Sequence, residues 1–337
     1  MPAVMRSIEV RDADALPLDA LVSEGQPVLL KGVARDWGLV HAGQVSTASA
    51  MAYLRGFDTG RPVTYSFGDP AIQGRPFYNE DFTALNVEVR RGGLGEVLDA
   101  IAAHLDDAQP PTYYVASLPV AGALPGFGQE NDLRLADRGV PAVPGIWIGN
   151  RVVASCHYDV PDNLAVCAVG QRAFTVFPPE QIDNLYPGPL DPTPGGQVVS
   201  LVDFDRPDPA RHPRFHKALA HAQTALLAPG DAIFIPGMWW HHVRSLAPFN
   251  VLVNYWWRNA PAFLPSPVSA LHHALWAIRD LPERDKAAWR HVFDYYVFGP
   301  SARAGEHIPE QARDVLGTID ETRARRIRAL LLGQLNR

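Results

Sequence analysis

The stretch from Pro144 to Trp257 alternates short apolar segments with turn residues. Strands this short and this closely spaced are typical of a β-sandwich or a β-barrel. The segments with the composition of strands are 146–148, 152–154, 164–169, 173–177, 225–227, 232–235 and 251–257. We therefore expect a mainly β fold for this part of the chain.

The connections within this stretch are short. Gly149-Asn150 and Gly170-Gln171-Arg172 each join two strand candidates and have the composition of hairpin turns, so we expect two β-hairpins. Trp239-Trp240-His241-His242 stands between the last two strand candidates and is expected to be a loop.

Residues before Pro144 mix strands with helices. Helical spacing of apolar residues predicts helices over 46–57, with Ser46 or Thr47 as the N-cap, and over 94–105. Strands are expected at 8–10, 27–33, 62–67 and 112–116, and shorter helical segments at 178–181 and 213–222.

The character of the sequence changes after Pro261. Val268, Leu271, Leu275 and Ile278 fall on one helical face, a second amphipathic segment surrounds Trp289–Tyr296, and 310–335 predicts two closing helices. We expect an N-terminal domain over 1–260, with a barrel core at about 110–257, and a helical region over 261–337. The apolar stripes predict a homodimer formed through these helices; the alternative is packing against the chain's own barrel.

Composition limits the classes of function. The chain has 337 residues, of which 47% are hydrophobic and 20% charged, as in a water-soluble globular protein. A net charge of −6 argues against a general nucleic-acid partner, and no apolar run approaches the ~20 residues of a membrane span. The two cysteines, Cys156 and Cys167, do not form a disulfide framework, so a reducing cytoplasm is the expected location.

A metal site is predicted from one His-x-Asp pair and one distant histidine. In a strand, residues i and i+2 share a face, so His157 and Asp159 project together. A third ligand follows the strand at 232–235, where spacing alone does not choose between His241 and His242. Two imidazoles and one carboxylate form the facial triad of non-haem Fe(II) oxygenases, which leaves coordination positions open.

Further motifs accompany this metal site between about Pro110 and Trp257. The full set is His157-Tyr158-Asp159, Asn163, Phe177-Pro178-Pro179-Glu180-Gln181, Leu185-Tyr186-Pro187, Pro229-Gly230-Asp231, Ile235-Pro236, Trp239-Trp240-His241-His242 and Asn254-Tyr255-Trp256. These motifs resemble those of the jumonji-C/cupin-type Fe(II)- and 2-oxoglutarate-dependent oxygenases, in particular the branch that contains the asparaginyl hydroxylase of hypoxia-inducible factor, with weaker similarity in Gln26–Val40.

The resemblance implies a double-stranded β-helix (a jelly-roll or cupin barrel) with flanking helices, and His157, Asp159 and His241 as Fe(II) ligands. In this family a cation fifteen residues after the first ligand binds the distal carboxylate of 2-oxoglutarate, and this position is Arg172. An arginine pairs well with a carboxylate because its guanidinium offers two parallel N–H groups.

Further positions match the co-substrate pocket of the resembling hydroxylase. Asn163, Asn254 and Tyr114 match polar positions, and Trp256 matches an aromatic residue near the metal. One departure is Ala154, where that enzyme has a threonine hydroxyl, so this contact is expected to be either absent or supplied by another group, such as Tyr114 or Thr175.

These features predict an oxygenase that hydroxylates a protein side chain or a small molecule and releases succinate and CO2. Two alternatives remain open: a cupin enzyme that uses another metal for isomerisation or hydrolysis, and a non-catalytic ligand sensor. The Pro-, Gly- and Asp-rich segment Asp191–Asp208 would be either a lid at the mouth of the site or a surface loop.

Overall fold

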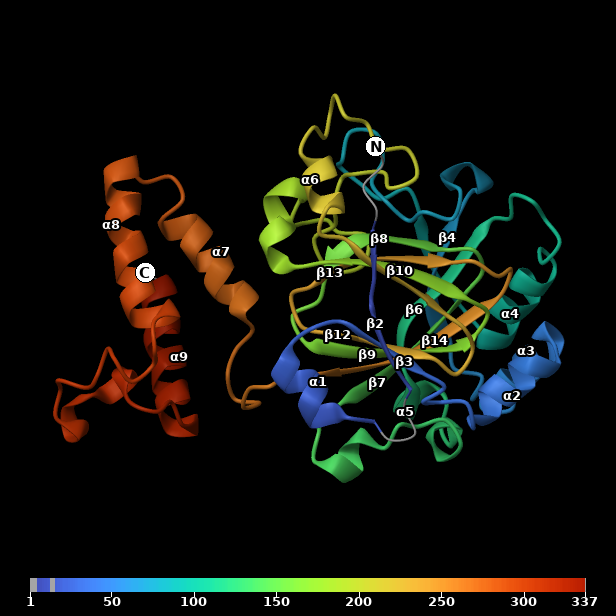
Figure 1. Cartoon of the computed structure of the whole chain (residues 1–337), viewed down its shortest axis with the longest axis horizontal. Coiled ribbons are helices and arrows are strands. Elements are labelled where there is room, and N and C mark those ends of the chain that lie inside the picture. The colour runs from blue at the N-terminus through green and yellow to red at the C-terminus, as the bar shows by residue number, and fades with distance from the viewer. Residues whose placement is uncertain (1–4, 13–15, 337) are drawn as a thin grey trace. The chain divides into compact units, whose positions relative to one another are not determined.

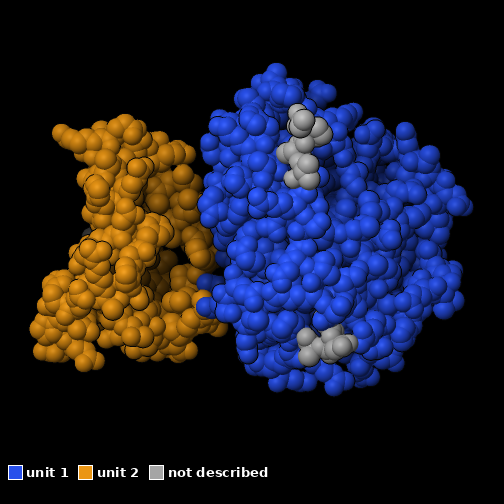
Figure 2. Space-filling model, viewed as in Figure 1, with its two compact units in different colours: residues 1–259 blue, residues 260–337 orange. Residues whose placement is uncertain are grey.

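The computed structural model describes residues 5–12 and 16–336. The chain divides into two compact units, residues 1–259 and residues 260–337 (Figure 2). All strands among the described residues lie in the first unit. No described helix is both long and apolar enough to cross a membrane.

Two β-sheets build the first unit (Figure 1). The smaller sheet contains, in spatial order, β1 (Arg6–Ser7), β11 (Gln223–Leu227), β10 (Arg172–Phe177), β13 (Trp240–Ser245) and β8 (Val153–Tyr158). The larger sheet contains β2 (Glu9–Asp12), β3 (Val28–Lys31), β12 (Ala232–Ile235), β9 (Asp162–Val169), β14 (Asn250–Trp257), β7 (Val143–Gly149), β6 (Thr112–Pro119), β4 (Val63–Gly68) and β5 (Glu88–Gly92). Neighbouring strands are antiparallel except in the pairs β1–β11 and β2–β3.

The prediction of two β-hairpins is wrong. β7 and β9 belong to the larger sheet, whereas β8 and β10 belong to the smaller one, so both short connections cross between sheets. Asn250, which is fully buried, holds both crossings: its Nδ2 donates to the carbonyl of Asn150 (3.1 Å), and its Oδ1 accepts from the amide of Gln171 (3.3 Å). Local turn composition does not reveal this arrangement because the partner strand β14 lies far along the chain.

The prediction of a loop at Trp239–His242 is also wrong. Trp240 to Ser245 form strand β13, which pairs with β10 on one side and β8 on the other. It therefore lies in the middle of the smaller sheet, and its residues alternate between the two faces of that sheet.

The core lies between the sheets and behind the larger one. Ala165 and Cys167 on β9 face Phe174 and Val176 of the smaller sheet, whereas Leu164, Val166 and Ala168 face a larger core on the other side. Both cysteines are buried and unpaired. Five helices contribute to the first unit before β7: α1 (Leu18–Glu24), α2 (Gly38–Val45), α3 (Thr47–Arg55), α4 (Leu94–Ala102) and α5 (Val120–Ala123).

Two of these helices follow the sequence signals closely. Ser46 is the N-cap of α3, and its hydroxyl accepts the amide of Ser49. α4 buries Leu94, Val97, Leu98 and Ile101 at helical spacing. α1 and α2 lie in regions where no helix was expected. Shorter helical segments are Pro70–Ile72, Phe127–Gln129, Leu135–Arg138, Pro179–Asn184 and α6 (Phe215–Leu219).

The second unit consists of helices α7 (Pro267–Ala277), α8 (Glu283–Phe293) and α9 (Glu321–Leu335). A π-helical turn, Asp294–Phe298, extends α8. The two closing helices expected over 310–335 are corrected to one α-helix, α9, preceded by two short 3₁₀ turns at Glu310–Ala312 and Asp314–Leu316.

Candidate metal centre

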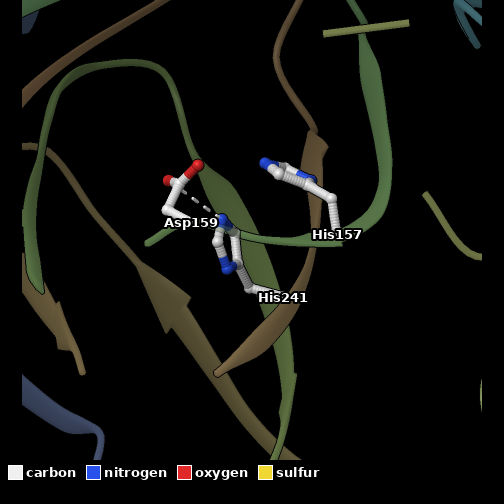
Figure 3. A group of neighbouring side chains, drawn as sticks. All are labelled: His157, Asp159 and His241. Atoms are coloured by element: carbon white, nitrogen blue, oxygen red, sulfur yellow. Dashed lines mark ion pairs between the residues drawn. The ribbon is translucent and has the colours of Figure 1, made fainter. Parts of the chain in front are cut away.

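Two neighbouring strands bring His157, Asp159 and His241 together (Figure 3). His157 lies in β8 and is paired directly with His241 in β13, and Asp159 follows the end of β8. One ligand atom from each side chain lies within 4.8 Å of the other two. The antiparallel register of two strands therefore assembles a three-ligand group from residues that are far apart in sequence.

Backbone carbonyls orient both imidazoles. His157 Nδ1 lies 2.8 Å from the carbonyl oxygen of Ser155, and His241 Nδ1 lies 3.0 Å from that of Trp239. A carbonyl only accepts, so each Nδ1 carries the proton and each Nε2 is left with a free lone pair. Histidines that bind metals are commonly held in this way.

The carboxylate of Asp159 is held by an indole. Trp256 Nε1 donates to Asp159 Oδ2 (3.1 Å), and the same oxygen lies 3.7 Å from His241 Nε2. Burial, together with nearby His157, lowers the pKa of His241 to about 4, and Asp159 opposes this shift. His241 is therefore neutral at physiological pH, as a metal ligand must be.

His242 points to the opposite face of β13. Its ring stacks on Phe204, with centroids 4.5 Å apart and planes inclined by 9°. Burial and the charge of Arg244 lower its pKa to about 4, against the influence of Asp205. The structure thus places His241 in the ligand group and His242 outside it, a choice that spacing had left open.

A cavity of about 340 Å³ adjoins the three ligands. It contains most of the other residues predicted for the site, namely Tyr114, Asn163, Arg172, Asn254 and Trp256. The remaining wall combines apolar side chains from both sheets with small polar ones: Ser66, Pro76, Ala116, Ser117, Trp147, Val152, Val153, Ala154, Ser155, Ala165, Phe174, Pro194, Gly195, Gln197, Val199, Val243 and Leu252.

Several buried polar atoms in this wall lack a hydrogen-bond partner within residues 5–12 and 16–336. Arg172 is only 3% exposed, yet its Nε and Nη2 have no hydrogen-bond partner among the described residues. The same holds for Asn163 Oδ1 and Asn254 Nδ2. Burying unpaired donors costs free energy, and a buried guanidinium costs most. The cavity therefore fits an anionic ligand that would pair with Arg172.

Tyr114 stands beside Arg172. Burial raises the pKa of the Tyr114 hydroxyl, and the neighbouring guanidinium, through its charge and a hydrogen bond, partly offsets this. The hydroxyl stays protonated and remains a hydrogen-bond donor. Tyr114 and Ala154 both line the cavity.

Thr175 is not brought into the cavity, and its predicted contact with the co-substrate is corrected. Arg172 and Phe174 on β10 line the cavity, but Thr175 is an odd number of positions from Arg172 and so lies on the other face of the strand. There it is paired with His242 and Thr224.

The structure adds two supporting contacts that sequence reasoning did not predict. Trp147, which the sequence offered only as an aromatic residue of a substrate groove or of the core, donates its Nε1 proton to Asn254 Oδ1 (2.7 Å) and thereby fixes the orientation of that amide. Arg75 Nε donates to Ser155 Oγ (3.1 Å), and the carbonyl of this same residue orients the imidazole of His157. No motif marks Arg75, because its partner lies 80 residues away.

Part of the predicted lid reaches the site. Pro194, Gly195 and Gln197 line the cavity, and Val199 pairs with His157 in an isolated antiparallel bridge. The amide of Ser200 donates to the carbonyl of Cys156 (2.7 Å). The segment is therefore attached to the edge of β8 next to a ligand.

Two sheets with an internal His-x-Asp and a distant histidine define a cupin-type protein with a candidate metal site. Residues 14–263 match the cupin-like domain family, and the chain belongs to this family. The sequence of the same region is also similar to that of JmjC-type proteins.

Three curated relatives illustrate this similarity. Human HSPB1-associated protein 1 is 37% identical over 131 residues, covering 37% of this chain and 26% of that protein. Zebrafish tRNA wybutosine-synthesizing protein 5 is 36% identical over 106 residues, covering 32% and 29%. Lysine-specific demethylase JMJ31 of Arabidopsis thaliana is 29% identical over 196 residues, covering 53% and 35%. The matches thus span only about a quarter to a third of each relative.

Proposed function

We propose that this chain is an Fe(II)- and 2-oxoglutarate-dependent oxygenase that hydroxylates a protein side chain or a small molecule. One observation carries the proposal. The three-ligand group His157, Asp159 and His241 shares a cavity with Arg172, a buried cation that has unpaired donors. A metal beside an anion site is what a chelating 2-oxo dicarboxylate requires.

The donor set supports Fe(II). Two imidazoles and one carboxylate, with no thiolate in the group, form the facial triad that leaves positions open for ligands. Bound Fe(II) would supply the oxygen activation that couples oxidation of 2-oxoglutarate to succinate and CO2 with hydroxylation of a C–H bond.

The protein's own residues would position the reactants. Arg172 would bind the distal carboxylate bidentately, and the Tyr114 hydroxyl and the amides of Asn163 and Asn254 would donate or accept around it. The carbonyls of Ser155 and Trp239 keep the imidazoles in one tautomer and orientation. Phe174, Leu252 and Trp147 form apolar wall, which lowers the water content around the co-substrate.

Two finer points belong to the proposal. The strand orders β12-β9-β14-β7 and β11-β10-β13-β8, with chain connections that pass between them, support a double-stranded β-helix. The motif His157-Tyr158-Asp159 with Trp239-Trp240-His241-His242 supports kinship with the asparaginyl hydroxylase branch.

The test is anaerobic titration of the metal-free protein with Fe(II) and 2-oxoglutarate. We expect a weak visible charge-transfer band, followed by succinate release on admission of air. His241→Ala should abolish the band, whereas His242→Gln, one position along the same strand, should retain it. Iron binding without either signal would favour the sensor alternative, and turnover with Zn(II), Mn(II) or Ni(II) alone would favour a different cupin enzyme.

A further inference from the structure

Strand β6 contains a β-bulge where it borders the cavity. The register of β6 on β7 shifts between Val115 and Leu118, so that Ala116 and Ser117 together lie opposite one residue of β7. In a regular strand two consecutive residues lie on opposite faces. At this bulge both Ala116 and Ser117 line the cavity, whereas Val115 and Leu118 pack in the core behind the sheet. The bulge therefore adds the side chain of Ser117 to the cavity wall.

Ser117 also has an unfavourable backbone conformation. Its φ of 51° lies in the left-handed region, which residues other than glycine, asparagine and aspartate adopt at a cost. No hydrogen bond of the Ser117 hydroxyl offsets this cost within residues 5–12 and 16–336. Bulges and strained residues are frequent next to active sites, where they direct a side chain toward a ligand. The local structure thus indicates that Ser117 binds a molecule that enters the cavity.

Ser117 lies near the metal end of the cavity. A Cβ on Gly145 would lie 3.6 Å from Ser117 Oγ and 3.1 Å from Asn254 Oδ1, so the hydroxyl is a near neighbour of this amide. Two positions after Asn254 on the same strand, Trp256 donates to the predicted ligand Asp159. The hydroxyl is therefore on the part of the wall that leads to the metal ligands.

The predicted co-substrate anchor lies toward the other end of β6. Tyr114, which stands beside Arg172, precedes Ser117 by three residues, on the order of 10 Å along the strand. Tyr114 is paired with Gly149 of β7, whereas Ser117 lies next to Gly145, four residues away on that strand. A dicarboxylate bound at Arg172 would leave the Ser117 hydroxyl available to a second molecule.

The charges around the cavity would cancel once metal and co-substrate are bound. Within the described ranges, the ionisable side chains that line it are the three metal ligands, Arg172 and Tyr114, whose phenol stays protonated. Fe(II) and Arg172 carry three positive charges, and Asp159 and 2-oxoglutarate carry three negative ones. An ammonium, guanidinium or carboxylate group that entered this cavity would remain unpaired, which is costly in a buried site. The cavity thus favours a neutral group.

We propose that the substrate presents an uncharged polar group, such as a carboxamide or a hydroxyl, and that the Ser117 hydroxyl binds this group beside the metal. The inference rests on the proposed function, to which it adds a substrate class and a residue that determines it. A serine hydroxyl both donates and accepts hydrogen bonds, so it can pair with either the carbonyl or the N–H of a neutral amide.

The test compares three planar molecules of nearly the same shape that differ in charge: acetamide, acetate and acetamidinium. Each is titrated, without oxygen, into the protein loaded with Fe(II) and 2-oxoglutarate, and a shift of the visible charge-transfer band reports binding. We expect acetamide to bind at least about tenfold more tightly than either ion, because an ion would stay unpaired. Ser117→Ala should weaken acetamide binding about 2- to 10-fold, as expected for one neutral hydrogen bond, and leave 2-oxoglutarate binding unchanged.

A change of charge at the same position should change the preference. Aspartate tolerates the left-handed backbone, so Ser117→Asp would place a carboxylate where the hydroxyl was and should bind acetamidinium more tightly than acetamide. Gln73→Ala is the matched control. Gln73 also has a φ of 51° but does not line the cavity, so this variant should bind acetamide as the wild type does.

Ser117→Gly separates binding from folding. Glycine adopts this φ without strain, so the metal-free variant should be about as stable to urea as the wild type, yet it should lose acetamide affinity to the same extent as Ser117→Ala. A serine with a merely structural role would instead leave acetamide binding intact in Ser117→Gly.

Two results would overturn the proposal: acetamide binding that Ser117→Ala does not weaken, or binding of either ion that depends on Ser117 as strongly as that of acetamide. Loss of 2-oxoglutarate affinity in Ser117→Ala would also overturn it, because the hydroxyl would then belong to the co-substrate site. All three results leave the proposed function intact. That function fails if the wild type gives no band with Fe(II) and 2-oxoglutarate, and the present proposal then fails with it.

Discussion

At the scale of single residues, the alternation of side chains along strand β10 distinguishes residues that line the cavity from residues that face away from it. Arg172 and Phe174 face the cavity, and Thr175 faces away. The residue at 172 is distinctive because its guanidinium is buried while two of its nitrogens find no hydrogen-bond partner in the part of the chain that the structure describes. Such a cation destabilises the empty protein and favours a bound anion.

Replacing Arg172 by Met should therefore weaken binding of 2-oxoglutarate by about 10- to 150-fold, the equivalent of losing charge-assisted hydrogen bonds worth about 1.5–3 kcal/mol. Binding of Fe(II) should be retained, because Arg172 is not one of the three ligands. Calorimetric titration with 2-oxoglutarate in the presence of Fe(II), without oxygen, measures the effect. Thr175→Val, on the opposite face of the same strand, is the matched control and should bind normally. Equal losses in both variants would contradict the anchor assignment.

The two buried histidines predict how stability depends on pH in the metal-free protein. The pKa values of His241 and His242 are about 4 in the folded state, against an ordinary 6.5. Because the pKa values are lowered in the folded state, the unfolded chain takes up protons at a higher pH than the folded protein does. The stabilising effect of the two neutral histidines is therefore complete above pH 6.5 and is lost as the pH falls toward 4. Each residue should reduce the free energy of unfolding by about 1.4 kcal/mol per pH unit in this window.

Urea unfolding at several pH values, with chelator present, would show this slope. His242→Gln should remove one residue's share of it without removing a metal ligand. The comparison is of slopes, because loss of the stacking on Phe204 also changes the stability at neutral pH. An unchanged slope in His242→Gln would show that folding does not lower the pKa of His242.

At the scale of elements, the crossings between sheets determine the shape of the site. Gly170, at the end of β9, has φ 78°, and a Cβ there would lie 2.3 Å from Asn250 Oδ1 and 2.6 Å from the carbonyl oxygen of Phe249. The carbonyl of Phe249, just before β14, and the side chain of Asn250, its first residue, thus lie so close to the crossing that only glycine fits. This contact directs the chain into the smaller sheet, where β10 begins at Arg172.

Gly170→Ala should consequently lower the free energy of unfolding by at least about 2 kcal/mol, from left-handed strain of about 1–2 kcal/mol and the clash with β14. Gly195→Ala is the control: no atom lies within 4 Å of a Cβ built at Gly195, so its stability should change by less than about 0.5 kcal/mol. Denaturant titration compares the two. A Gly170→Ala protein as stable as the control would mean that β14 can move away from the crossing.

The same elements show what sequence reasoning predicts well. Strand segments and the helices α3 and α4 follow from local patterns, because burial of one face imposes a period on the sequence. The pair His157 and Asp159 follows from strand alternation, and the resemblance chose His241. Hairpins were misassigned because pairing partners are non-local: Gly170 contacts β14, about eighty residues on. Because the residues of a strand alternate between its two faces, the position of Arg172 would already have excluded Thr175 from the cavity.

At the scale of the whole molecule, the candidate metal centre and the helices α7, α8 and α9 lie in different units. All three ligands and Arg172 are within residues 1–259, and the three helices are within residues 260–337. Ligand binding stabilises the part of the structure that is required for binding. The effect of the metal should accordingly be confined to one unit.

Removal of the metal tests this separation. Fe(II) or Mn(II) at about 100 times its dissociation constant should stabilise the folded first unit by about 2.7 kcal/mol, and excess chelator should reverse this. The expected gain arises because two neutral imidazoles and a carboxylate, held by the carbonyls of Ser155 and Trp239 and by the Trp256 indole, are already oriented for binding.

Hydrogen exchange with and without metal should show slower exchange in β8, β13 and the segment around Val199, which is bonded to β8, but no change in α7, α8 or α9. The Asp159→Ala variant should show no metal-dependent change in any of these elements. Metal-dependent protection of α9 in the wild type would instead show that the two units are energetically coupled.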